Sequence, residues 1–297
     1  MLKAESLDSQ INHYQAKLFP FAYNIVGDYF EAEDIVQESL NNFILGEQEN
    51  ITSSFNYLVK TVINKSINFK NSLRNRKEVY PGNWLPVPIF TEETIYSEAD
   101  QSQILNYSLL VLLEKLKPHE RAVFILKETY DFPHQEIGEI LEITTEYSRQ
   151  LLKRAKQKIA PYPAQPLHPK KENAEIMEQL AEAISNTDIE KVKSLLSASV
   201  QSISDGGPKA SAARKILEGE DRVYKFLKAL WHKYVPGSPK KFLSVNHSPA
   251  ILFFHQSLVF RVMVFEMTGN KIDKIYIIVN PDKLQHFNAQ NDISERH

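Results

Sequence analysis

A basic, amphipathic segment near the middle of the chain carries the clearest chemistry in the sequence. Residues 132–158, FPHQEIGEILEITTEYSRQLLKRAKQK, predict two short helices joined by a tight turn, because apolar positions recur at helical spacing. Thr144 precedes the second helix as a predicted N-cap, whose hydroxyl accepts a hydrogen bond from a backbone N–H. The outward face of that helix then holds Thr145, Glu146, Arg149, Gln150 and Lys153. This pattern predicts a helix-turn-helix, whose second helix enters the major groove of DNA.

Catalytic and metal-binding patterns are weak by comparison. The chain has no cysteine, which excludes disulfides and thiolate metal sites and fits a reducing compartment. The acid–base candidates in the C-terminal part are Asp205, His232, His247 and His255. Lone histidines beside strands are usually packing or surface residues, and no ligand spacing such as H-x-x-x-H is present. We therefore predict no catalytic residue, no metal site and no cofactor.

The elements before the helix-turn-helix segregate their charges, although the formal net charge is only −2. Residues 21–50 contain seven acids and no Lys or Arg, whereas residues 55–77 contain six cations and no acid. Both stretches have helical periodicity. The unremarkable interpretation is two solvated helix faces. A helix with many cations and no anions repels itself unless a polyanion compensates, so we favour a nucleic-acid surface on the second helix.

A proline-rich linker separates these helices from the helix-turn-helix. Within residues 78–103, three prolines and a glycine fall in one run of eight residues, among Tyr80, Trp84 and Leu85. Proline keeps such a segment extended, and its apolar side chains need a surface to cover them. The linker is predicted either to pack on its own domain or to lie as a strap against another domain. A second linker, residues 161–171, follows the helix-turn-helix.

The C-terminal part has a different character. Helices are predicted near 173–185, 187–197 and 220–234, followed by four strands, KKFLSVNH, AILFFHQ, LVFRVMVFEM and KIDKIYIIV. Turns at SP and GN would make the sheet an antiparallel meander in an α+β domain. Residues 205–209 are expected to form a tight surface loop, and residues 288–297 a polar tail that is disordered at its end. No run of about 18–20 apolar residues and no secretory leader is present, so a cytoplasmic location is expected.

Several motifs in this order resemble a known family. EAEDIVQESLNNF (Glu31–Phe43) and FNYLVKTVINKSINFKNSLRNR (Phe55–Arg76) resemble region 2 of bacterial sigma factors of the extracytoplasmic-function type, and Leu116–Ile159 resembles region 4. YPGNWLP, SDGGPK and NPDKL are similar to motifs of the subgroup with a fused C-terminal SnoaL-like domain.

The resemblance implies two all-α domains and an α+β domain of the SnoaL-like cone or barrel type. It implies region 2 over residues 1–77, the linker over 78–103, region 4 over 104–160, a linker over 161–171 and a regulatory domain over 172–297.

The resemblance also implies roles for individual residues. Residues that bind core RNA polymerase, at the clamp helices of its largest subunit, would be Glu33, Asp34, Gln37 and Glu38. The minus-ten promoter element would be contacted by Asn64, Lys65, Asn68, Arg74 and Arg76, and residues 45–54 would capture a flipped-out base. The minus-thirty-five element would be contacted by Thr145, Tyr147, Arg149, Gln150, Lys153 and Arg154. Arg154, Lys156 and Lys158 would contact phosphate or flank the core.

The remaining expectations concern regulation. Interdomain contacts would involve Tyr80, Trp84, Leu85, Pro86, Asp205, Gly206, Gly207, Lys209, Asn280, Pro281, Asp282 and Lys283. The implied function is a sigma factor whose fused domain replaces a separate anti-sigma factor. The implied partners are core RNA polymerase, including its flap, and promoter DNA, with no membrane and with a small-molecule or protein effector as an option. Two alternatives stay open: a helix-turn-helix transcription factor that works without polymerase, and an enzyme or ligand sensor in the C-terminal cavity.

Overall fold

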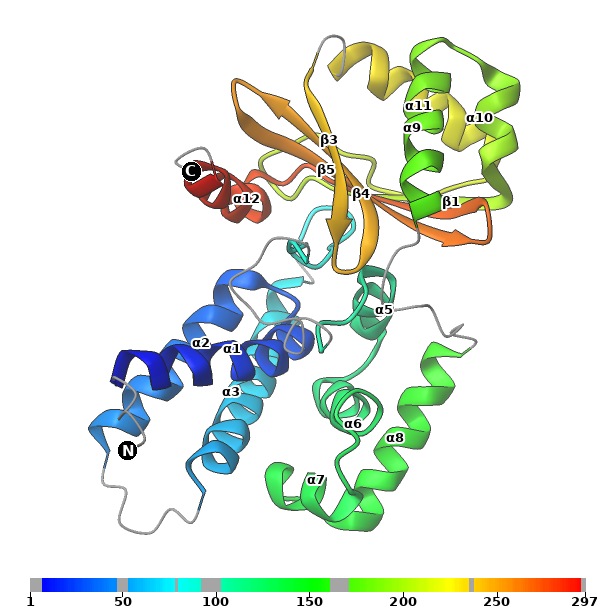
Figure 1. The fold of residues 1–297 in the computed structure, drawn as a ribbon. Helices are drawn as coiled ribbons and strands as arrows, with labels where there is room; N and C mark the ends of the chain where they lie inside the picture. Colours follow the sequence, from blue (N-terminus) through cyan, green and yellow to red (C-terminus); the bar gives the residue numbers. More distant parts are fainter. Residues whose placement is uncertain are drawn as a thin grey trace. The chain divides into compact units, whose positions relative to one another are not determined.

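The chain folds into two compact units (Figure 1). The computed structural model describes residues 7–46, 53–77, 80–91, 103–160, 171–234 and 238–294. The first unit comprises residues 1–78, 94–105 and 109–165, and the second comprises residues 79–93, 106–108 and 166–297. The described stretch of the proline-rich linker, residues 80–91, therefore belongs to the same compact unit as the C-terminal part of the chain. No helix among the described residues is long and apolar enough to cross a membrane.

The first half of unit 1 is a bundle of three helices, α1 (Leu7–Val26), α2 (Tyr29–Leu45) and α3 (Ser54–Lys77). Asp28 caps α2, because its carboxylate accepts hydrogen bonds from the backbone N–H groups of Phe30 and Glu31. The apolar faces of the three helices meet in a core that includes Leu18, Ile25, Val36, Leu58 and Ile63. This packing leaves the acidic side of α2 and part of the basic side of α3 available to partners.

The second half of unit 1 contains the predicted helix-turn-helix. Its elements are α5 (Tyr107–Leu112), whose first two residues belong to unit 2, η1 (Leu113–Lys115), α6 (Pro118–Glu128), α7 (His134–Leu141) and α8 (Thr145–Ile159). The turn after α7 has Glu142 in the left-handed region, at φ 56°. Gly138 allows the chain to return closely, since a Cβ there would lie 2.7 Å from the carbonyl oxygen of Ile143.

A buried ionic network links the two halves of unit 1. The Nζ of Lys70 on α3 lies 2.7 Å from Oε1 of Glu114 on η1, and Arg121 of α6 also pairs with Glu114. Arg121 Nε donates to the carbonyl oxygen of Asn24 at 2.8 Å. Arg121 is fully buried and Lys70 is 7% exposed. Lys70 therefore has a structural role and does not contribute to the nucleic-acid surface expected from the charge of α3.

Unit 2 is built on a six-stranded mixed sheet in the order β2-β1-β6-β5-β4-β3. The strands are β1 (Leu196–Asp205), β2 (Leu217–Glu218), β3 (Lys240–Val245), β4 (Ser248–His255), β5 (Leu258–Thr268) and β6 (Lys271–Ile278). Its helices are α9 (Lys171–Ser185), α10 (Ile189–Leu195), α11 (Glu220–Tyr234) and α12 (Pro281–Ser294).

The two faces of this sheet have different coverings. Helices α9, α10 and α11 cover one face, where Leu180, Leu227, Trp231, Met263 and Phe265 belong to one apolar cluster (Figure 1). Neighbouring positions along a strand point to opposite faces. The other face therefore carries Asp205, which contacts the linker, and Tyr276, whose ring contacts the ring of Tyr107.

The structure corrects several expectations for unit 2. The sheet is not wholly antiparallel, because β1 pairs in parallel with β6. Strand β1 was not expected, since its alternating serines and alanine carry a weak strand pattern. The β3–β4 turn lies at Asn246 and His247, both with positive φ, and not at the SP pair, which begins β4. Helix α12 extends into the polar tail as far as Ser294, and the end of the tail, which was expected to be disordered, lies outside the described residues.

Candidate nucleic-acid surface and linker clasp

The outward side of α8 is a polar, cationic surface. The cap is as predicted, because Thr144 Oγ1 accepts a hydrogen bond from Tyr147 N at 3.1 Å. Arg149, Gln150, Lys153 and Arg154 are exposed, while Thr145 is half-buried at the start of the helix. Tyr147 is 42% exposed. These side chains lie together on the face that a helix-turn-helix presents to the major groove.

The inward side of α8 is fixed to the rest of the helix-turn-helix. His134 Nδ1 and Ser148 Oγ, at 2.9 Å, join α7 to α8. Burial lowers the pKa of His134, and the nearby Arg149 cation lowers it further, so the imidazole is neutral at pH 7. Lys158 Nζ binds the buried carboxylate of Glu120 at 2.6 Å. Lys158 therefore holds α8 onto α6 and is not a free phosphate contact.

The acidic side of α2 is mostly exposed. Asp34, Gln37 and Glu38 are solvent-exposed, and Glu33 is half-buried. Burial is the largest cause that raises the pKa of Glu33, although the hydroxyl of Tyr29 donates a hydrogen bond to its carboxylate at 3.4 Å. Glu33 and Gln37 are one helical turn apart, so α2 offers a strip of acceptors suited to a basic helix.

Two of the residues on α3 that were expected to bind DNA, Asn64 and Lys65, contact other parts of unit 1. Lys65 Nζ lies 2.9 Å from Glu38 Oε1 on α2. Asn64 Nδ2 donates to the carbonyl oxygen of Ile140 on α7 at 3.0 Å. A third, Asn68, is exposed.

The remaining minus-ten residues are only partly described. Arg74 and Arg76 lie in the last turns of α3, and their side chains fall outside the described set. Of the segment expected to capture a flipped base, residues 47–52 also lie outside it.

The motifs SDGGPK and NPDKL meet in unit 2, where they hold the linker. Asp205 of the first motif and Lys283 of the second contact Tyr80, Trp84 and Leu85. We call this arrangement the linker clasp. The Asp205 carboxylate accepts hydrogen bonds from the Tyr80 hydroxyl at 2.6 Å and from the backbone N–H of Leu85 at 2.8 Å. Lys283 Nζ lies 2.7 Å from Asp205 Oδ2. Asp205 is fully buried, so the expected surface loop is wrong at this residue.

Lys283 completes the clasp from α12. Its ammonium donates to the carbonyl oxygen of Leu85 and lies 4.0 Å from the centre of the Trp84 ring, a cation–π contact. Asn280 Nδ2 donates to the Tyr80 hydroxyl at 2.9 Å. Burial and the bond to Asp205 raise the pKa of Tyr80. The polar backbone of a buried, extended linker is thus satisfied by two charged side chains.

The clasp requires glycine at Gly207. Its φ is +55°, and a Cβ at this position would lie 2.5 Å from Asn280 Nδ2 and 3.0 Å from the Tyr80 hydroxyl. Gly207 N also donates to Asp205 Oδ1 at 3.0 Å. Gly206 is buried beside it, whereas Lys209 is exposed and pairs with Asp282 at 2.6 Å.

A second anchor holds the end of the linker and was not found from the sequence. Asn246 Oδ1 accepts from Ile89 N at 3.0 Å, and Asn246 N donates to Ile89 O at 3.0 Å. Tyr107 donates its hydroxyl to the carbonyl oxygen of Pro86 at 2.8 Å. The signal for Asn246 was its position in a two-residue Asn-His turn between strands, where Asn tolerates positive φ.

The polar residues considered for catalysis are separate in unit 2. Asp205 is committed to Lys283, His247 is buried in the β3–β4 turn, and His232 and His255 are exposed on α11 and at the end of β4. The space between the helices and the sheet is packed with the apolar cluster. Among the described residues, no group of three or more His, Asp or Glu side chains is arranged to hold a metal ion.

Comparisons with known proteins agree with this architecture. Residues 107–159 match the family Sigma-70, region 4. The ECF RNA polymerase sigma factor SigJ of Mycobacterium tuberculosis (strain ATCC 25618 / H37Rv) is 26% identical over 295 residues, with 93% of this chain and 92% of that protein covered. The probable ECF RNA polymerase sigma factor SigI of Mycobacterium tuberculosis (strain CDC 1551 / Oshkosh) is 25% identical over 286 residues, with 93% of this chain and 94% of the relative covered.

A solved structure has the same fold over nearly the whole length. The crystal structure of Mycobacterium tuberculosis extracytoplasmic function sigma factor SigJ matches with a TM-score of 0.75 and 24% identity, covering 94% of this chain and 98% of that one. The helical unit, the region 4 match and the fused α+β unit therefore agree in order and extent. Over nearly its whole length, the chain is therefore similar to extracytoplasmic-function sigma factors, and its residues 107–159 match Sigma-70, region 4.

Proposed function

We propose that this chain directs core RNA polymerase to specific promoters, and that its SnoaL-like unit tunes this activity by holding the linker between regions 2 and 4. The observation that carries the proposal is the linker clasp. In it, two buried charged side chains bind the main chain of a segment that lies in the sequence between the two DNA-reading domains. The exposed acids of α2 would bind the clamp helices of the largest polymerase subunit, and region 4 would contact the flap.

Charge reversal on α2 tests the polymerase contact. Glu33→Lys with Glu38→Lys should weaken co-purification with core polymerase by at least about tenfold, because two favourable charge contacts become repulsive. The matched control is Glu178→Lys with Glu182→Lys, which reverses two exposed acids on α9 of unit 2. Equal retention of core polymerase by both double variants would rule out the α2 surface.

The same experiment separates a sigma factor from a transcription factor that acts without polymerase. The full chain mixed with core polymerase should yield run-off transcripts from a selected promoter, and the chain alone should bind that promoter much more weakly than the holoenzyme does. An equally tight and equally specific complex without polymerase would favour the alternative.

Arg149 is the residue that we expect to read a base in the minus-thirty-five element. Arginine pairs bidentately with guanine, so Arg149→Ala should lower the preference at a single promoter position by about 1–3 kcal/mol, roughly 5- to 150-fold. Arg154→Ala is the comparison, because loss of a phosphate contact weakens all sequences alike and reduces the salt dependence. Promoter selection with holoenzyme from a randomised library measures both. A uniform loss in Arg149→Ala would assign that residue to phosphate.

The contact between α3 and α7 predicts a restrained state of the free protein. Asn64 donates a hydrogen bond to the carbonyl oxygen of Ile140, and Lys60 Nζ lies 2.9 Å from Glu142 Oε1. Polar residues of region 2 therefore bind residues of region 4 in the free protein. Glu142 is 76% exposed at its side chain, and a surface pair contributes about 0–1 kcal/mol. Glu142→Gln should therefore increase promoter binding by the free protein modestly, by up to about fivefold.

The control for this variant is Glu139→Gln, an exposed acid on α7 that contacts Gln135. Amide hydrogen exchange in α7 should become faster in Glu142→Gln and stay unchanged in Glu139→Gln. If both variants bound promoter DNA equally well, their effect would be a general loss of negative charge and the α3–α7 restraint would be excluded.

The enzyme alternative has less support. The interior of the SnoaL-like unit is filled by apolar side chains, and the acid–base candidates do not gather there.

A further inference from the structure

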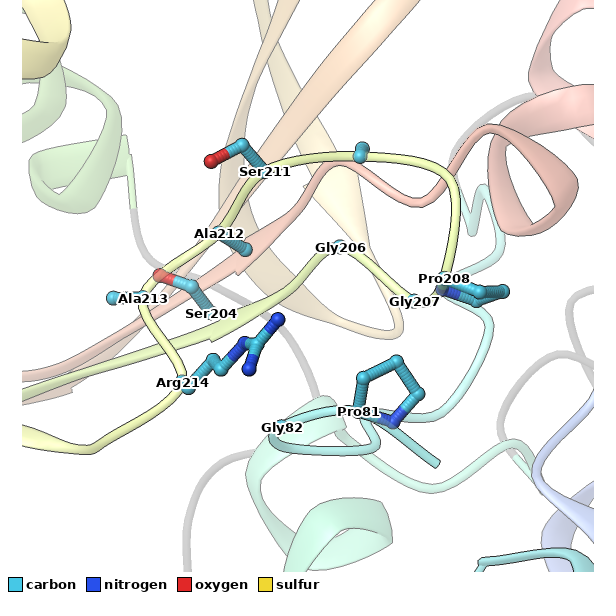
Figure 2. A pocket seen from close by; sticks show the side chains of 11 residues that line it. Pro81, Gly82, Ser204, Gly206, Gly207, Pro208, Ser211, Ala212, Ala213 and Arg214 are labelled. Carbon is cyan, nitrogen blue, oxygen red and sulfur yellow. The ribbon is translucent and has the colours of Figure 1, made fainter. Parts of the chain in front are cut away.

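A pocket lies inside unit 2 where the linker passes the loop between β1 and β2. Its volume is about 280 Å³. The linker supplies Pro81 and Gly82, β1 supplies Ser204, and the loop supplies residues from Gly206 to Arg214 (Figure 2). It is distinct from the helix–sheet interior, which is packed with apolar side chains. The space is enough for a small metabolite or a simple anion.

The lining is polar and carries one sign of charge. Arg214 is exposed, and its guanidinium extends into the space between Gly206 and the Pro81–Gly82 segment (Figure 2). Ser204 and Ser211 add hydroxyl groups, and no Asp or Glu among the described residues lines the pocket. A planar guanidinium recognises carboxylate and phosphate oxygens with paired hydrogen bonds. The chemistry of the lining therefore selects an anion.

Ser204 is a second polar residue of the lining, and it is buried. The residue is 2% exposed, and its Oγ has no hydrogen-bond partner among the described residues. A buried hydroxyl without a partner is unfavourable, so its presence beside a pocket requires an explanation. An anion in the pocket would offer the missing acceptor.

The neighbouring carboxylate, Asp205, does not repel an anion in the pocket. Asp205 points to the opposite face of the sheet, as strand alternation requires, and its negative charge is neutralised by Lys283 in the clasp. The two adjacent residues of β1 therefore have different surroundings: Asp205 holds the linker, and Ser204 belongs to the lining of the pocket.

The geometry points to a binding site for a small anion that carries a phosphate or carboxylate group, with Arg214 as the charged ligand and Ser204 and Ser211 as hydroxyl donors. Pro81 and Gly82 form one wall, two residues before Trp84, so the bound anion stabilises the docked linker. Asn83 already joins this wall to the carbonyl oxygens of Ser204 and Ala213, at 3.4 and 3.5 Å. The regulatory meaning of the site depends on the proposed function, but its binding chemistry does not.

Binding is tested on the full chain without polymerase or DNA, so that failure here is distinguishable from failure of the sigma-factor proposal. The probes are inorganic phosphate and succinate, each compared with sodium chloride at matched ionic strength. Either probe should raise the melting temperature and change the emission of Trp84, measured in a Trp231→Phe background because the chain has two tryptophans. Stabilisation by phosphate alone, or by succinate alone, identifies the preferred group.

Matched variants locate the effect. Arg214→Gln should weaken binding at least about tenfold, as expected for loss of a charged hydrogen bond. Arg222→Gln, an exposed arginine on α11, should leave it unchanged. Ser204→Ala should weaken binding while leaving the unliganded fold as stable as before or more so, because it removes an unpartnered hydroxyl. The proposal is overturned if both probes act no more strongly than sodium chloride, or if Arg214→Gln and Arg222→Gln lose the effect equally.

Discussion

Asp205→Ala is expected to lower the free energy of unfolding of the C-terminal unit by about 3–5 kcal/mol, the usual cost of leaving a buried ionic partner uncompensated. Lys283 is 6% exposed and would keep its charge in a site without a carboxylate. The backbone N–H of Leu85 and the hydroxyl of Tyr80 would lose their acceptor as well. Denaturant unfolding in a Trp231→Phe background, followed by the emission of Trp84, measures the change.

The control for Asp205→Ala is Asp282→Ala. Asp282 also pairs with a lysine, Lys209 at 2.6 Å, but both side chains are about half exposed, at 45% and 60%. Its replacement should cost less than about 1 kcal/mol. If Asp205→Ala and Asp282→Ala lost the same unfolding free energy, the burial of the Asp205–Lys283 pair would not be the cause of the destabilisation.

A double variant separates the linker's role from stability. Asp205→Ala with Lys283→Met removes both charges, and a buried pair replaced by apolar groups often regains stability. The double variant should therefore recover part of the unfolding free energy without recovering the hydrogen bonds to the linker. If its promoter output in a reconstituted transcription assay equalled that of the unaltered chain, the clasp would be structural only and the proposed regulation would be wrong.

Glu114→Ala should have a comparable effect on the helical unit. Glu114 lies between two buried cations, Lys70 and Arg121, which come from different halves of that unit. Removing the carboxylate takes away the anion with which both buried cations pair. We therefore expect a loss of about 3–5 kcal/mol in unfolding free energy. Run-off transcription should fall in parallel at temperatures near the lowered melting point.

Glu128→Ala is the matched control, because Glu128 pairs with Lys156 at 2.8 Å where both side chains are partly exposed. Its cost should be below about 1 kcal/mol. The loss of unfolding free energy in Glu114→Gln should lie between those of Glu114→Ala and Glu128→Ala, since an amide oxygen still accepts one hydrogen bond. A Glu114→Ala protein as stable as Glu128→Ala would show that Lys70 and Arg121 find other acceptors.

Much of this protein was predictable from local sequence. The helix-turn-helix follows from apolar spacing and from Thr144, because an amphipathic helix and its cap are set by residues within a few positions of one another. The start of α6 at Pro118 and the exposure of Arg149, Gln150 and Lys153 follow for the same reason. The family resemblance added the order of the domains and the likeness to sigma regions 2 and 4.

Only the tertiary structure decided which charges serve the fold and which remain available to partners. Lys70 and Arg149 are both cations on helices, yet one is buried against Glu114 and the other is exposed. Asp205 in a glycine-rich motif indicated a surface loop, but its partners lie 78 and 125 positions away in the sequence. Periodicity records the neighbours along an element, whereas the pairing of buried charges depends on contacts between elements distant in the chain, which no local pattern encodes.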